Sequence, residues 1–143
     1  MTEANVKRAI SLAVWGLGIL GGLWGCLAYV GTMFVAGEND SAQEIRALTF
    51  ALATPLPACI LALWQRVIAG SWLVFAGAYY AYGMLAERTY MIEVRHFPDQ
   101  LSITKTIESS LFFAGPLFAL GTFGIVTGLL RWPPVWKGKA LCP

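Results

Sequence analysis

The glycine-rich stretch GLGILGGLWG, residues 16–25, contains the pattern G-x-G-x-x-G at residues 16–21. In dinucleotide-binding proteins this pattern forms the turn from a strand into a helix, and an acidic residue about 20 positions later binds the ribose. Here the pattern lies within a long apolar run that leaves no room for a preceding strand, and the acid nearest to that spacing is Glu38. We therefore expect no nucleotide site at these glycines.

The same glycines fit the close packing of helices in a membrane. Because lipid tails are as apolar as leucine, such helices associate through van der Waals contact at small residues, often spaced four apart. That spacing recurs in residues 18–25 and in residues 115–128, which is more than one helical hairpin requires. We predict that some of these surfaces pack inside the bundle and that one binds a partner, although all of them could be internal. The residues are Gly18, Gly21, Gly22, Gly25, Gly115, Ala119, Gly124 and Gly128.

Residues 54–57, Thr-Pro-Leu-Pro, interrupt an otherwise helix-like apolar run. Each proline lacks a backbone N–H and clashes with the carbonyl four residues earlier, so a helix must bend there. One interpretation is a broken helix in which Thr54, Pro55 and Pro57 line a path for an ion or a small solute. The other is a kink whose freed carbonyls are satisfied by the Thr54 hydroxyl and by neighbouring helices. The sequence leaves both interpretations open.

Three tyrosines, Tyr79, Tyr80 and Tyr82, cluster near the end of another apolar run. Tyr79 and Tyr82 could line a pocket for a bound lipid, a quinone or a hydrophobic pigment at a helix interface. More often such a cluster anchors a helix at the headgroups of the bilayer. No other cofactor is indicated.

Groups suited to catalysis, metal binding or ion coupling are sparse. His96 is the only histidine, and with Glu93 and Asp99 nearby it still lacks the further nitrogen or sulfur ligands that a metal site needs. No ionisable Asp, Glu, His, Lys or Arg lies within residues 9–37, 47–65, 67–86 or 109–130, whereas proton-coupled carriers usually keep one in the membrane. We expect neither an enzyme nor a metal site.

These four uncharged runs contain the glycines, the Thr-Pro-Leu-Pro segment and the tyrosine cluster, so the fold of the runs determines where these residues lie. Each run is close to or above the roughly 20 apolar residues that a transmembrane helix requires. The chain of 143 residues is 57% hydrophobic and 13% charged, with a mean hydropathy of +0.63, whereas soluble domains carry about 25% charged residues. Only helices or closed barrels satisfy their backbone in lipid, and the runs lack strand-like alternation, so we predict an all-α membrane protein.

The predicted fold is an antiparallel bundle of four transmembrane helices in a single domain, residues 1–143. The spans are expected at about 9–36, 44–65, 67–87 and 106–130, with a non-membrane segment at 88–105. Ser41-Ala-Gln-Glu44 matches a capping box that would start the second helix. Trp64-Gln-Arg66 leaves room for only a tight turn into the third helix. The first run is about twice as long as the apolar part of a signal peptide, so we expect it to be retained.

The charges predict the orientation, because cytoplasmic segments carry an excess of Lys and Arg. The two termini and the link at Arg66 hold six basic residues and one acid. The segments 38–46 and 87–108 hold four basic residues and seven acids. We therefore predict that both termini are cytoplasmic. The net charge of +2 gives no reason to expect nucleic acid as a partner.

The stretch PLPACILALWQRVIAGSWLVFAG, residues 55–77, resembles the second and third helices of small, uncharacterised four-helix bacterial membrane proteins. The resemblance covers this one hairpin. It implies a bacterial plasma membrane and implies no function.

Two functions fit these observations. The first is a non-catalytic integral membrane subunit that packs in a larger complex and helps to assemble or stabilise it, with lipids and other membrane subunits, or copies of itself, as partners. The alternative is a small oligomeric channel or facilitator for an ion or a small neutral solute. Solute flux into protein-loaded liposomes would separate the two.

Overall fold

The computed structural model describes residues 2–35, 50–93 and 103–133, and every regular element within these ranges is helical. The elements are α1 (Glu3–Val35), α3 (Pro55–Leu61), α4 (Arg66–Glu93) and α5 (Ile103–Leu129). The predicted all-helical class is therefore confirmed for this part of the chain. Three of the helices, α1, α4 and α5, are long and apolar enough to cross a membrane.

The second predicted span is described only from Phe50, as a shorter apolar helical segment over Phe50–Leu61. It bends at Thr54, immediately before the two prolines of α3, because prolines cannot donate to the preceding turn. Thr54 keeps a helical backbone, with φ −75° and ψ −28°, and its hydroxyl donates to the Phe50 carbonyl. Only residues 62–65 separate α3 from α4, so the two helices are joined by the tight turn that Trp64-Gln-Arg66 predicts.

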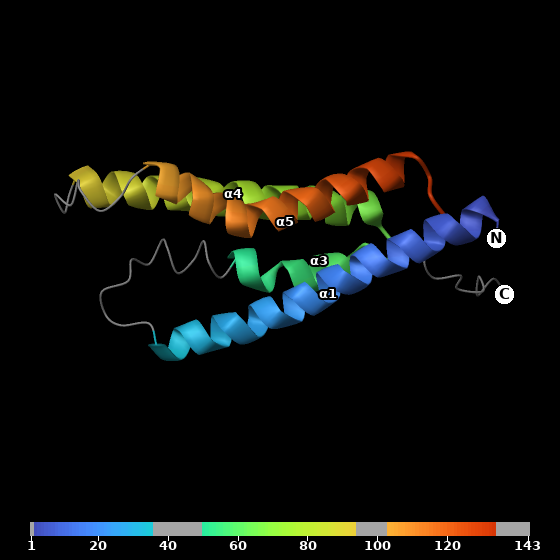
Figure 1. The fold of residues 1–143 in the computed structure, drawn as a ribbon, viewed down its shortest axis with the longest axis horizontal. Coiled ribbons are helices and arrows are strands. Elements are labelled where there is room, and N and C mark those ends of the chain that lie inside the picture. Colours follow the sequence, from blue (N-terminus) through green and yellow to red (C-terminus); the bar gives the residue numbers. More distant parts are fainter. Residues whose placement is uncertain (1, 36–49, 94–102, 134–143) are drawn as a thin grey trace.

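The helices form two pairs (Figure 1). Helices α4 and α5 lie side by side along most of their length, and α1 lies along α3. The pairs come together at one end of the bundle, which is formed by residues 3–15 of α1, the turn at 62–65 and residues 128–133 at the end of α5 and just after it. We call this the turn end. The opposite end, with the last turns of α4 and the first turns of α5, is the far end.

The interior is built from small side chains, because the helices approach each other closely. Besides Trp15, Leu73, Tyr80 and Leu117, the buried apolar residues are cysteine and alanines: Ala51, Ala58, Cys59, Ala62, Ala69, Ala76 and Ala114. The closest approach is between α4 and α5. A Cβ atom placed on Gly70 would lie 2.5 Å from the carbonyl oxygen of Gly121, so only glycine permits this crossing.

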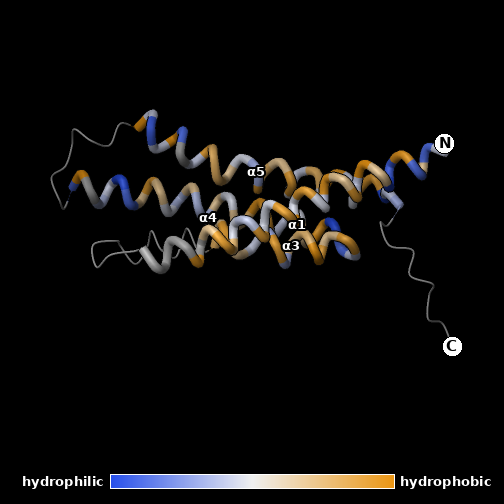
Figure 2. The backbone as a smooth tube through the Cα atoms, turned by 60° about the horizontal axis from the view of Figure 1, so that its bottom comes forward, coloured by the Kyte–Doolittle hydropathy of each residue, from blue (hydrophilic) through white to orange (hydrophobic). Residues whose placement is uncertain are grey.

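Most large apolar side chains lie on the outside, which is the arrangement expected in lipid rather than water. Among them are Leu17, Leu20, Trp24, Phe75, Leu111, Phe112 and Leu129. Figure 2 shows hydrophobic residues along the middle of the long helices and hydrophilic residues at the start of α1, in the last turns of α4 and at the start of α5. This distribution fits three helices that cross an apolar layer.

Two helices extend past the spans expected from the sequence. Helix α4 continues to Glu93 and α5 begins at Ile103, so part of the segment predicted as a loop at 88–105 is helical. The sequence prediction ended the third span at Glu87 and began the fourth after Lys105, because charged residues limit burial in lipid; they do not limit helix formation. Glu87, Arg88 and Lys105 all lie within helices.

Candidate functional site at the turn end and along α1

One face of α1 carries glycines in direct contact with the bent second helix. A Cβ atom on Gly22 would lie 2.7 Å from the backbone nitrogen of Leu56, and one on Gly25 would lie 3.0 Å from the Leu52 carbonyl oxygen. A Cβ atom on Gly18 would lie 2.7 Å from Cys59 Sγ. We call Gly18, Gly22 and Gly25 the packed face of α1.

The packed face covers the proline kink. Cys26, next to Gly25, directs its thiol toward the Leu52 carbonyl at 3.9 Å, on the turn before the bend. Thr54 is only 8% exposed, and its hydroxyl donates within its own helix. Pro55 is half-buried and Pro57 is exposed. The kink is therefore stabilised in two ways: α1 packs against it, and the Thr54 hydroxyl donates a hydrogen bond within the bent helix.

Gly124 and Gly128 also contact a neighbouring helix. A Cβ atom on Gly124 would lie 3.0 Å from both the Arg66 carbonyl oxygen and Trp15, and one on Gly128 would lie 2.5 Å from Val67 Cγ2. These positions allow the end of α5 to lie against the start of α4. The α4–α5 crossing also uses Gly70 and Gly121, whose backbones contact each other.

The remaining predicted packing positions face outward. A Cβ atom on Gly21 or Gly115 would have no neighbouring heavy atom within 4 Å, and the same holds for Gly16. Ala119 is exposed. On α1 the outward glycines lie among large exposed side chains. We call Gly16, Leu17, Leu20, Gly21 and Trp24 the open face of α1.

The three clustered tyrosines differ in their surroundings. Tyr79 stacks near Phe75 and Phe50, with centroid distances of 6.4 Å and 5.2 Å. Tyr82 is exposed, whereas Tyr80 is buried against Phe113. Thr54, Pro55, Pro57, Tyr79 and Tyr82 line neither the pocket beside Arg66 nor the one beside Ser110, both of which are formed by described residues.

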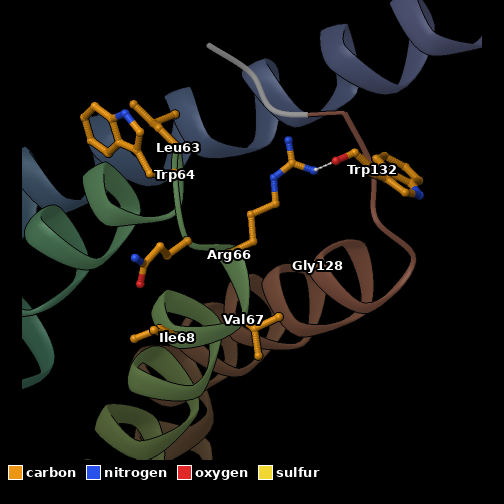
Figure 3. A pocket seen from close by; sticks show the side chains of 8 residues that line it. Leu63, Trp64, Arg66, Val67, Ile68, Gly128 and Trp132 are labelled. Carbon is orange, nitrogen blue, oxygen red and sulfur yellow. Dashed lines mark hydrogen bonds between the residues drawn. The ribbon is translucent and has the colours of Figure 1, made fainter. Parts of the chain in front are cut away.

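The turn end is organised around Arg66, the first residue of α4. Arg66 is only 6% exposed. Its Nη2 donates to the Pro133 carbonyl at 2.8 Å, and Nη1 lies 3.5 Å from the Trp132 carbonyl oxygen (Figure 3). These bonds join the α3–α4 turn to the segment that follows α5, across 66 residues of sequence.

The backbone after α5 is shaped to present those carbonyls. Arg131 has φ 50°, and its N–H donates to the Gly128 carbonyl at 3.1 Å. The Trp132 N–H donates to the Thr127 carbonyl at 3.0 Å. This pair of bonds is a Schellman motif, which ends a helix with one left-handed residue. The chain therefore reverses at Arg131 and places Trp132 and Pro133 beside Arg66.

The first turns of α1 complete the turn end. Trp15 is fully buried, with its ring 5.8 Å from Phe123, whose ring is 6.0 Å from Trp132. Lys7 Nζ lies 5.9 Å from the Trp132 ring and 2.5 Å from Glu3 Oε1. Three buried side-chain atoms on this stretch of α1 have no hydrogen-bond partner: Arg8 Nε, Ser11 Oγ and Trp15 Nε1.

A pocket of about 580 Å³ opens beside Arg66. Its lining comes from the α3–α4 turn, the first turn of α4 and the end of α5: Leu63, Trp64, Gln65, Arg66, Val67, Ile68, Gly128 and Trp132. In Figure 3 the Arg66 side chain rises between Trp64 on one side and Trp132 on the other. The sequence prediction used Arg66 for topology and for the tight turn, and it assigned Arg66 to no site. The one feature of the sequence that could have indicated this site is a cation, Arg66, between tryptophans in an otherwise apolar hairpin.

Several predictions fall on residues outside the described ranges. These are the capping box at Ser41–Glu44, the loop with His96 and Asp99, and the C-terminal tail from residue 134. Within the described residues, no group of three His, Cys, Asp or Glu side chains could hold a metal ion. Comparisons with protein families, with curated proteins and with solved structures find no match to this chain.

Proposed function

We propose that this chain is a non-catalytic integral membrane subunit that packs against another membrane protein and helps to assemble or stabilise a larger complex. The observation that carries the proposal is the open face of α1. A Cβ atom on Gly16 or Gly21 would meet no heavy atom within 4 Å, and the same face carries Trp24, which is 74% exposed. The described helices of the chain leave this small-residue surface uncovered.

The chemistry of this face favours a helix over lipid as its occupant. Small residues let a second backbone approach closely, which is the main source of attraction between helices in a membrane. Gly21 and Trp24 are three residues apart and so lie on the same side of the helix. Trp24 is near the middle of α1, away from the helix ends where tryptophan anchors to headgroups. A large aromatic beside a glycine gap is typical of an interface anchor.

The charge distribution supports a defined orientation for this subunit. The turn end carries Lys7, Arg8, Arg66 and Arg131 with one acid, Glu3, whereas the far end of α4 and α5 carries Glu87, Glu93 and Glu108 with Arg88 and Lys105. The excess of basic residues favours a cytoplasmic turn end. With four antiparallel spans, both termini are then cytoplasmic, in a bacterial plasma membrane.

The proposal is tested by changing the open face without changing the fold. Gly21→Leu fills the gap beside Trp24, and Trp24→Ala removes the anchor, so each should reduce partner recovery about tenfold or more after mild-detergent extraction. A photo-crosslinker at residue 20 should form an adduct with the same partner in the unchanged protein and not in either variant. Circular dichroism of the isolated chain should stay unchanged, and neither variant should unfold at a lower temperature than the unchanged chain.

The matched control is Ala78→Leu, which places the same leucine side chain at an exposed small residue of α4. It should leave both recovery and crosslinking intact. A homogeneous 15.5 kDa species without any crosslinked partner would contradict the proposal. So would a Gly21→Leu variant that retains the partner as fully as Ala78→Leu does.

A further inference from the structure

The turn end contains a buried cation without a matching acid. Arg66 is 6% exposed, and among the residues described it forms no ion pair. Glu3 is the one described acid at this end, and it is paired with Lys7. Glu87 and Glu93 belong to the last turns of α4, at the far end of the same helix. Because a buried charge is costly unless it is compensated, this guanidinium favours an anionic partner.

The hydrogen bonds of Arg66 leave room for that partner. A guanidinium has five N–H donors. Two of them point to backbone carbonyls, at 2.8 Å for Pro133 and 3.5 Å for Trp132. Among the described residues the other three donors have no acceptor, and the two carbonyls hold the guanidinium in one orientation. Arginine held in this way matches the paired oxygens of a phosphate.

The pocket beside Arg66 has the size and lining for a phosphate group attached to an apolar body. Its volume of about 580 Å³ falls within the range of about 300–1,000 Å³ that is usual for small-molecule sites. Gln65 adds an amide donor next to Arg66, while Leu63, Val67 and Ile68 supply an apolar wall. This combination fits a headgroup and the first part of its acyl chains.

The surroundings of the pocket point to a membrane lipid as the source of the phosphate. Trp64, 65% exposed, lies on one side of Arg66 and Trp132 on the other, as interfacial tryptophans do at the level of lipid headgroups (Figure 3). The turn end also carries the basic residues Lys7, Arg8, Arg66 and Arg131. Anionic lipids are attracted to clusters of basic residues near the membrane surface.

We propose that the pocket at the turn end binds the phosphate of an anionic membrane phospholipid, with the Arg66 guanidinium as its main ligand. The bound headgroup compensates the Arg66 charge and covers the joint between the α3–α4 turn and the segment after α5. This site is separate from the open face of α1, so it does not depend on the proposed partner.

Native mass spectrometry of the full chain, released from neutral detergent, measures the binding. Titration with phosphatidylglycerol should give an affinity at least tenfold higher than titration with phosphatidylcholine. Gln65→Glu places a carboxylate beside Arg66 and should lower phosphatidylglycerol affinity at least tenfold. Arg66→Gln should do the same. Gln65→Glu decides the test if Arg66→Gln does not fold, because Gln65 is exposed and lies outside the helices.

The matched control is Arg131→Asn, which removes an exposed positive charge at the same end and keeps a residue that tolerates φ 50°. It should change phosphatidylglycerol affinity less than twofold. Equal binding of the two lipids, or an unchanged affinity in Gln65→Glu, would overturn the site. Millimolar glycerol phosphate should not displace the lipid. Full displacement would identify a site for free phosphate and overturn the assignment to a lipid.

Discussion

The packed and open faces of α1 both carry glycine, but they differ in what lies against them. On the packed face, Gly22 meets the backbone of Leu56 so closely that a Cβ atom would lie 2.7 Å from its nitrogen. On the open face, Gly21, the adjacent residue, has no neighbour within 4 Å. The first glycine is explained by the fold of the chain itself. The second has no packing role among the described residues, which is why it supports an external partner.

The α4–α5 crossing should give the largest effect of adding a single methyl group. In Gly70→Ala the new Cβ would lie 2.5 Å from the Gly121 carbonyl oxygen and 2.8 Å from the Ile125 nitrogen. Both contacts are backbone atoms that cannot move aside without shifting a helix, so we expect a loss of about 3 kcal/mol in the free energy of unfolding. Equilibrium unfolding in mixed detergent micelles, followed by circular dichroism, measures this loss.

The matched control for this crossing is Gly115→Ala, on the outward side of α5. Its Cβ would meet no atom within 4 Å, so the change should be neutral or stabilising by up to about 1 kcal/mol, because alanine favours the helix over glycine. Equal losses in Gly70→Ala and Gly115→Ala would show that close approach does not distinguish the two positions.

The adjacent pair on α1 sharpens the same comparison within one helix. In Gly22→Ala the methyl group meets the Leu56 backbone at 2.7 Å and 2.9 Å, and we expect a loss of about 2 kcal/mol in the free energy of unfolding. In Gly21→Ala the methyl group meets nothing, and a gain of up to about 1 kcal/mol is expected. Thermal unfolding of the two variants in one detergent gives the ranking directly. A Gly21→Ala variant less stable than Gly22→Ala would reverse the assignment of the two faces.

The sequence could predict that these helices pack through glycines, but not which of the glycines spaced four residues apart face a neighbouring helix of the same chain. Gly21 lies only about 40° around the helix from Gly25, at roughly 100° per residue, so spacing alone gives it the same role. The structure separates them because the packed face is narrow and is set by the backbone of Leu52 and Leu56 on a bent helix. That bend is itself predictable from Pro55 and Pro57, whereas its position against α1 depends on tertiary packing.

The site at the turn end was harder to predict, because its parts are distant in sequence. Arg66 donates to carbonyls that are 66 and 67 residues away, and no local pattern records such a pairing. The tight turn before Arg66 and the prolines after Trp132 were visible in the sequence. The left-handed residue that joins α5 to this site was not, since the position is occupied by arginine rather than glycine.

Substitution of Arg131 should give the smallest change in the free energy of unfolding. It tests the ability of glycine to adopt a left-handed backbone, which is separate from its role in close helix packing. Here the backbone has φ 50°, a conformation that costs most residues roughly 1–2 kcal/mol and costs glycine little. Arg131→Gly should therefore raise the free energy of unfolding by about 1 kcal/mol, measured in the same detergent mixtures. Arg131→Ala should bring no such gain, because alanine keeps the Cβ atom that clashes. An equal gain in both variants would show that relief of charge at the turn end, and not the left-handed backbone, is responsible. A gain restricted to glycine would mean that the left-handed backbone at residue 131 carries an arginine at a cost in stability.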